Sequence, residues 1–133
     1  MRRSEGREIG RLGEHIAAEF LRRRGFTIIQ ANYRRPWGEI DIIAVKGNTV
    51  RFVEVKSVSR ESRPRDISRE IDNRPEEMVQ AHKLKKIART AMLYMEEMRD
   101  EREYQIDVVG VVMDVHARTA RCRLFEQVVD DEL

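Results

Sequence analysis

Residues 38–56 read GEIDIIAVKGNTVRFVEVK, which is two short β-rich runs separated by a tight turn. Valine, isoleucine and phenylalanine favour strands, and the Gly47-Asn48 dipeptide is typical of a two-residue hairpin turn. The sequence therefore predicts two antiparallel strands, Ile40–Val45 and Val50–Val55, joined by this turn.

The turn also predicts which residues of the two strands face each other. With Gly47 and Asn48 at its centre, the opposed pairs are Ile43 with Phe52, Asp41 with Glu54, and Glu39 with Lys56. Directly opposed residues share a face, so this face is apolar near the turn and charged at its far end. Like charges opposed across a sheet are destabilising, so the two carboxylates need a cation between them or a raised pKa on one of them. Lys56 offers part of that positive charge.

A pair of converging carboxylates is an oxygen ligand set that suits Mg²⁺ or Mn²⁺. Such a metal activates a bound water and shields charge on a phosphoryl oxygen, and Lys56 can orient the water or stabilise the same charge. Glu14 supplies a third carboxylate if its helix lies across the charged end of the face. Gly10 and Gly13 precede Glu14 at a spacing that allows close backbone approach.

A simpler interpretation is that these charged residues only form a solvated face. The neighbours of Asp41 and Glu54 favour the metal site, because both acids lie within apolar strands. A buried charge costs several kcal/mol unless it is paired or bound to a metal.

The remaining periodicity predicts two helices, three further strands and one long loop. The helices are expected over Glu5–Arg24 and Pro75–Met98, the strands over Thr27–Asn32, Gln105–Met113 and Ala120–Glu126, and the polar loop over Ser57–Arg74. Strands joined by tight turns form an antiparallel meander, whereas a strand reached through a helix can return parallel to its neighbour. We therefore expect a mixed sheet with a helix on each side or both helices on one side.

Length and composition indicate one domain, residues 1–133, with its own core. Hydrophobic residues make up 41% of the 133 residues and charged residues 38%, which excludes disorder throughout. The net charge is only +2, but residues 1–60 hold 13 basic and 7 acidic residues. This half of the chain is therefore basic, although it contains the acids of the expected site. The single Cys122 and the lack of an apolar run of about 18 residues favour a cytoplasmic protein with no membrane segment.

Three short motifs of this sequence resemble those of a known family. GEIDIIA at 38–44 followed by FVEVK at 52–56, with GRLGE at 10–14 upstream, resembles the YraN-like family of small bacterial proteins. More distantly the layout is similar to the archaeal Holliday-junction resolvases and the PD-(D/E)-x-K nucleases. The resemblance implies a restriction-endonuclease-like αβββαβ core with a central mixed sheet flanked by helices. Ile40 stands where the motif has its proline.

The resemblance also implies a set of site residues and partners. Asp41 and Glu54 would bind the metal, and Asp41, Glu54, Lys56 and Glu14 would be the catalytic residues of an endonuclease that hydrolyses phosphodiester bonds in DNA, including branched DNA. Gln80 and Lys83 match positions where such nucleases place a polar residue facing the site. A homodimer is expected by the same resemblance, since a two-fold substrate needs two sites.

Basic residues on both sides of the first strand are candidates for phosphate contacts: Arg22, Arg23, Arg34 and Arg35. Ordinary solvation of a helix end and a loop explains them equally well. Two other functions stay open for the same fold, namely a nucleic-acid-binding subunit without turnover and a protein-interaction module.

Overall fold

The computed structural model describes residues 3–60 and 79–129, which form two helices and five strands. The helices are α1 (Arg3–Arg23) and α4 (Ala81–Glu97). The strands are β1 (Thr27–Arg35), β2 (Gly38–Lys46), β3 (Thr49–Arg60), β4 (Tyr104–Asp114) and β5 (Thr119–Phe125). This is the predicted mixed α/β architecture, and its element order is consistent with an αβββαβ core. Neither of these two helices is both long and apolar enough to cross a membrane.

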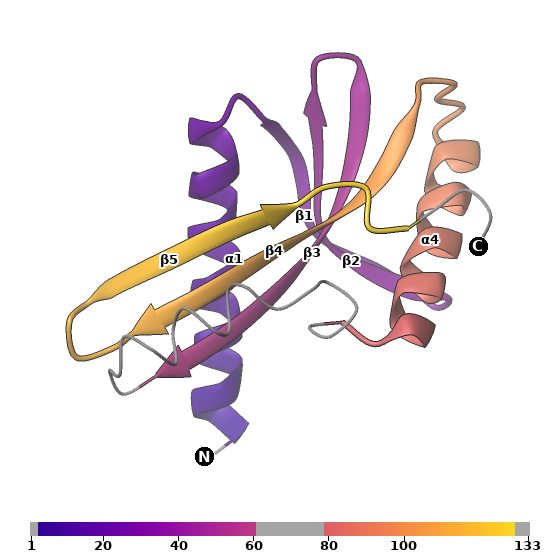
Figure 1. Cartoon of the computed structure of the whole chain (residues 1–133). Coiled ribbons are helices and arrows are strands. Elements are labelled where there is room, and N and C mark those ends of the chain that lie inside the picture. The colour runs from indigo at the N-terminus through magenta and orange to yellow at the C-terminus, as the bar shows by residue number, and fades with distance from the viewer. Residues whose placement is uncertain (1–2, 61–78, 130–133) are drawn as a thin grey trace.

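The strands form one mixed sheet in the order β1-β2-β3-β4-β5 (Figure 1). Only β3 and β4 are parallel, because the chain returns through α4 between them; the other neighbours are antiparallel. The helices cover opposite faces. Leu21 of α1 packs in one core cluster with Ile42, whereas Tyr94 of α4 packs in the other with Ile43 and Phe52.

The hairpin between β2 and β3 confirms the predicted register over its inner half. Gly47 has a φ of +61°, a conformation that a residue without a Cβ adopts readily. Pairing then follows the predicted register from Lys46 and Thr49 to Ile42 and Val53. The ladder ends there, so Asp41 with Glu54 and Glu39 with Lys56 are not ladder partners, and that part of the prediction is wrong. Figure 1 shows why: the first half of β2 lies toward α4, whereas the second half of β3 runs away from it.

Two predicted boundaries are corrected. The polar loop does not begin at Ser57, because residues 57–60 extend β3 and pair in parallel with residues 111–114 of β4. The rest of the predicted loop, up to residue 74, lies outside the described residues. So does Pro75, the predicted start of the second helix; Val79 and Gln80 are described, and they precede the helix. Gln80 is extended, with φ −63° and ψ 145°, and α4 begins at Ala81.

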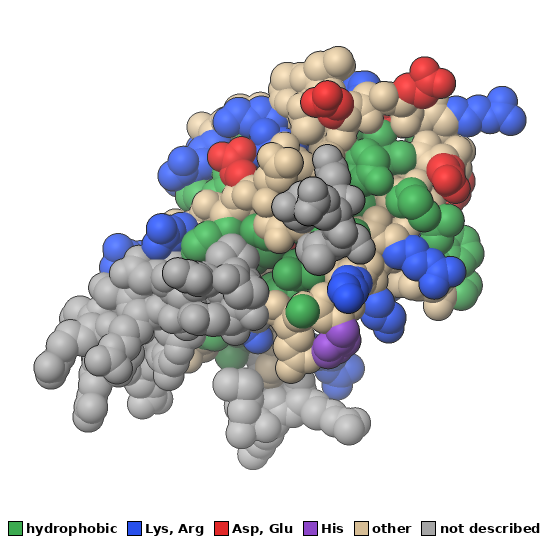
Figure 2. Space-filling view, turned by 45° about the vertical axis from the view of Figure 1, so that its right-hand side comes forward, with side chains coloured by type: hydrophobic (Ala, Val, Ile, Leu, Met, Phe, Trp, Pro, Cys, Tyr) green, Lys and Arg blue, Asp and Glu red, His purple; other side chains and the backbone are tan. Residues whose placement is uncertain are grey.

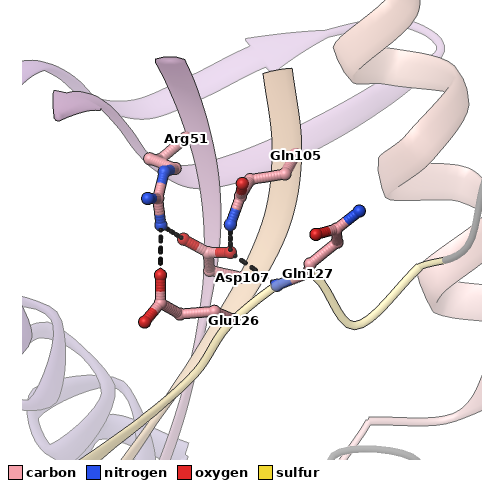
Figure 3. Close-up of polar contacts among 5 residues, drawn as sticks. All are labelled: Arg51, Gln105, Asp107, Glu126 and Gln127. Carbon is pink, nitrogen blue, oxygen red and sulfur yellow. Dashed lines mark hydrogen bonds and ion pairs between the residues drawn. The ribbon is translucent and has the colours of Figure 1, made fainter. Parts of the chain in front are cut away.

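A buried charge network ties β3 to β4 and to the segment after β5 (Figure 3). Asp107 is fully buried and accepts hydrogen bonds from Arg51 Nη1 at 2.8 Å, Gln105 Nε2 at 2.9 Å and the Gln127 backbone N–H at 2.9 Å. The same Arg51 Nη1 lies 2.9 Å from a carboxylate oxygen of Glu126. One guanidinium therefore compensates a carboxylate that water cannot reach.

Helix α1 approaches β3 most closely at Gly13. A Cβ on Gly13 would lie 1.8 Å from Oγ and 2.7 Å from Cβ of Ser57, which confirms the close approach predicted for this glycine. The same prediction for Gly10 is wrong, because nothing lies within 4 Å of a Cβ built there. Gly13 thus sets how near α1, and with it Glu14, comes to the end of β3.

We expect Gly13→Ala and Gly10→Ala to change stability in opposite directions. Alanine at position 13 overlaps Ser57 and should lower the free energy of unfolding by about 1–3 kcal/mol. Alanine at position 10 meets open space and should raise it by about 0.5–1 kcal/mol, because alanine loses less backbone entropy in a helix. Urea unfolding of both variants measures the difference, and equal effects would contradict the close approach at Gly13.

Candidate active site

An open cleft of about 590 Å³ lies where β2 and β3 diverge, between α1 and the start of α4. Its lining includes all four predicted catalytic residues and two of the predicted nucleic-acid-binding residues: Glu14, Asp41, Glu54, Lys56, Gln80 and Lys83. Gly6, Ile9 and Gly10 of α1 form one wall. The fold therefore brings together residues that lie up to 69 positions apart in the sequence.

The side chain of Asp41 connects β2 to β3 at the point where the backbone ladder between them ends. Its Oδ2 accepts a hydrogen bond from the Val55 backbone N–H at 2.8 Å. The alternation of side chains also shifts at this point, since Ile40 and Ile43 belong to the α4-side core and Ile42 to the α1-side core. Asp41 is thereby held at the junction of the two strands, within reach of acids on both sides of it.

Glu54 is the most deeply buried acid of the cleft, with 5% of the residue exposed. The pKa of Glu54 is raised to about 7: burial is the largest cause, the charge of Asp41 and a hydrogen bond with it also raise the pKa, and Lys83 lowers it. The Lys83 Nζ lies 2.6 Å from Glu54 Oε1. We expected Lys56 to supply this charge; the ion pair instead comes from α4.

The raised pKa of Glu54 predicts how stability changes with pH in metal-free protein. Between about pH 4.5, the ordinary value, and pH 7 the folded state binds more protons than the unfolded state, so stability falls as pH rises. Glu54→Gln abolishes this loss and should make the protein more stable above pH 7 by up to about 3 kcal/mol, with little difference near pH 4. Urea unfolding across this range with a chelator present tests it, and parallel pH profiles for both proteins would contradict it.

Glu14 adds a third carboxyl group from α1. Burial raises its pKa first, and the charge of Asp41 and a hydrogen bond with it raise it as well, while a hydrogen bond from Asn32 and the charge of Arg34 lower it. Three acids thus form a chain of contacts, Glu14 to Asp41 to Glu54. Burial and the charge of Asp41 therefore disfavour the charged forms of both Glu14 and Glu54.

The lysines lie at the opening of the cleft. Lys56 is exposed and follows Glu54 by two residues on β3. Lys83 is also half exposed, at 56% of its side chain, although its ammonium group contacts Glu54. Burial lowers the pKa of Lys83, but the hydrogen bond to Glu54 and the charges of Glu54, Asp41 and Glu39 raise it more. Two cationic groups therefore border the acids on the solvent side of the cleft.

The four predicted phosphate-binding arginines separate into two groups. Arg34 lies close enough to Glu14 for its charge to affect that residue's pKa. Arg35 lies 3.5 Å from Glu97 of α4 and stacks over the Tyr33 ring at 4.4 Å. Arg22 pairs with Glu19, and it and Arg23 occupy the last turn of α1, where neither lines the cleft.

Asn32 is the site residue that our reading of the sequence did not single out. Its neighbours Ala31 and Tyr33 pair with Ile42 and Ile40, so Asn32 stands opposite Asp41. Its φ of +54° is unusual for a strand and is tolerated best by asparagine among residues other than glycine. An asparagine within a predicted strand was the available signal, since asparagine is depleted in strands.

The donor set suits a divalent cation that prefers oxygen. Even with Lys83 at 2.6 Å, burial and the charge of Asp41 keep the pKa of Glu54 at about 7, so a further cation would stabilise its charged form. Among residues 3–60 and 79–129, no three Asp, Glu, His or Cys side chains are grouped so that they alone could hold a metal ion. One or two carboxylates with several waters is the usual way in which proteins hold Mg²⁺, and Asp41 and Glu54 fit that pattern.

Comparison with known proteins identifies the family. The model of "Uncharacterised protein family UPF0102" matches residues 13–111. A UPF0102 protein of Dictyoglomus thermophilum is 35% identical over 109 residues, covering 80% of this chain and 84% of the relative. UPF0102 proteins of Chlorobium chlorochromatii and Caldicellulosiruptor saccharolyticus are each 37% identical over 110 residues, covering 83% and 82% of this chain and 77% and 86% of those relatives. The chain therefore belongs to the UPF0102, or YraN-like, family, as its motifs predicted.

Proposed function

We propose that the protein is a metal-dependent nuclease that acts on DNA inside the cell, including branched or otherwise structured DNA. The observation that carries this proposal is the chain of three acids, Glu14, Asp41 and Glu54, in an open cleft beside Lys56 and Lys83. Partly buried carboxylates that repel one another cost stability, so a function that uses their charge accounts for their presence.

Each residue has a role in this proposal. Asp41 and Glu54 would hold Mg²⁺ or Mn²⁺, which when bound supplies an activated water and shields the charge on the phosphoryl oxygen. Glu14 would complete the acidic cluster beside Asp41. Lys56 orients the attacking water or stabilises charge on the scissile phosphate, and Lys83, Gln80 and Arg34 contact the DNA backbone near the cleft.

The proposal is tested by incubating the purified protein and Mn²⁺ with linear duplex, single-stranded and four-way-junction DNA. We expect cleavage by the wild type, and loss of cleavage in Asp41→Ala and in Lys56→Ala. Arg22→Ala is a matched control, because Arg22 lies outside the cleft and should leave the cleavage rate nearly unchanged.

Cleavage that survives both substitutions in the cleft would come from a contaminant and would contradict the proposal. Gel-shift binding without cleavage under Mg²⁺ or Mn²⁺ would also contradict it. That result would favour the alternative in which the same fold binds nucleic acid and a partner supplies the chemistry.

A further inference from the structure

The outer side of α4 carries an exposed surface that belongs to neither core cluster nor to the cleft. We call it the α4 patch and define it by Lys85, Arg89, Met92, Glu96 and Tyr104. Met92 is 43% exposed and Tyr104 is 40% exposed. Figure 2 shows hydrophobic side chains on this right-hand side of the molecule, with basic side chains below them and both acidic and basic side chains above.

Two grooves flank the centre of the α4 patch. The larger, about 860 Å³, is lined by Lys85, Arg89 and the first residues of β4 among others, and the smaller, about 450 Å³, by Glu96 and Arg99 among others. Met92, Glu101 and Tyr104 line both grooves, so they form the ridge between them. A largely hydrophobic ridge with a hollow on each side is the shape that a second ridge can interlock with.

The charges around the ridge have opposite sign at its two ends. Arg89 precedes Met92 by three residues and Glu96 follows it by four, so all three lie along one side of the helix. Within the part of the chain that the structure describes, neither Arg89 nor Glu96 has a side-chain hydrogen bond or an ion pair. Each therefore remains available to an opposite charge from outside the protomer.

We propose that the α4 patch binds a second copy of this chain, with the two α4 helices packed antiparallel about a two-fold axis beside Met92. That axis places Met92 against the partner's Met92. It also places Arg89 of each protomer against Glu96 of the other, so this ion pair forms twice. Burial of two hydrophobic ridges and two ion pairs stabilises the dimer. The linings of the two grooves hold equal numbers of basic and acidic residues, so they offer no net positive surface to a nucleic acid or an anionic membrane: Lys85, Arg89, Arg99 and Arg102 against Glu96, Asp100, Glu101 and Glu103.

The inference is independent of the proposed nuclease activity, because no residue of the α4 patch lines the catalytic cleft. Sedimentation velocity of the full chain over micromolar concentrations should show a monomer–dimer equilibrium. Met92→Glu should weaken association by at least about tenfold, because it places two carboxylates at the centre of the interface. Leu12→Glu is the control: Leu12 is 52% exposed on α1, away from the α4 patch, and its replacement should leave association unchanged.

Charge reversal tests the antiparallel geometry directly. Arg89→Glu alone and Glu96→Arg alone each place like charges together and should weaken association. The double variant exchanges the two charges and should restore association to near the wild-type level. A monomer at every concentration would overturn the proposal, and so would a dimer that Met92→Glu leaves intact or a double variant as weak as either single one. Circular dichroism confirms that each variant is folded.

Discussion

Asp41→Asn should reduce DNA cleavage by about 10²- to 10³-fold, the scale observed when one preorganised electrostatic group is removed from an active site. The same substitution should leave the fold intact and make it more stable. Asparagine keeps a side-chain oxygen that can accept the hydrogen bond from the Val55 N–H. It removes the negative charge that raises the pKa values of Glu14 and Glu54.

The relief of repulsion should raise the free energy of unfolding by about 0.5–2 kcal/mol at pH 8 in the absence of metal. Loss of activity together with a gain of stability identifies a residue kept for function at a cost in stability. Cleavage rates under single-turnover conditions and urea unfolding of the same preparation measure both effects. Destabilisation by Asp41→Asn would show that the Asp41 charge serves the fold and would contradict this expectation. The alternative of a protein-interaction module also predicts a gain of stability, but with DNA binding unchanged, and loss of metal binding in Asp41→Asn would count against that alternative.

Arg51→Met should lower the free energy of unfolding by about 3–5 kcal/mol, the scale expected when one partner of a buried ion pair is removed. The substitution leaves Asp107, which is fully buried, without the guanidinium that lies 2.8 Å away. Glu126 loses the same contact, so the segment after β5 also loosens (Figure 3). Thermal and urea unfolding measure the loss.

Two further variants separate this explanation from simple loss of packing. Arg102→Met removes an ion pair of similar length, 2.7 Å to Asp100, but an exposed one, and should leave the melting temperature nearly unchanged. Asp107→Asn in the Arg51→Met background removes the uncompensated charge and should recover part of the lost stability. An equally unstable double variant would indicate that the Arg51 side chain acts through packing alone.

The alternation of apolar residues and the turn residues were sufficient to predict the elements, the parallel return of β4 and the inner register of the hairpin. The apolar stripe of α4 likewise predicted a helix that packs on the sheet. Local patterns determine these features, because each element must bury its own apolar side.

Other features depend on contacts between distant segments. The polar run Ser57–Arg60 reads as a loop, yet it is a strand because β4 offers it a parallel ladder. The hairpin register held only as far as Ile42, because beyond it the Val55 N–H donates to the Asp41 side chain and the backbone ladder of β2 with β3 ends. No rule that counts residues from the turn can locate where two strands separate.

The candidate site also combines features that local sequence predicts with features that depend on distant contacts. Spacing and chemistry identified Asp41, Glu54, Lys56 and Glu14, and the cleft contains all four. The ion pair of Glu54 with Lys83 could not be derived from spacing, since it joins β3 to a helix 29 residues later. Arg22 and Arg23 do not reach the cleft because helix α1 is long. They lie in its last turn, whereas the residues of α1 that line the cleft lie in its first half.

We propose that Asp41 and Glu54 together bind a divalent metal. Titration calorimetry with Mn²⁺ alone, at pH 8 and without DNA, measures this binding in wild type and in Asp41→Ala. We predict a saturable heat of binding near one Mn²⁺ per chain in the wild type and none in Asp41→Ala. No binding by the wild type, or equal binding by both proteins, would show that these two carboxylates do not form a metal site.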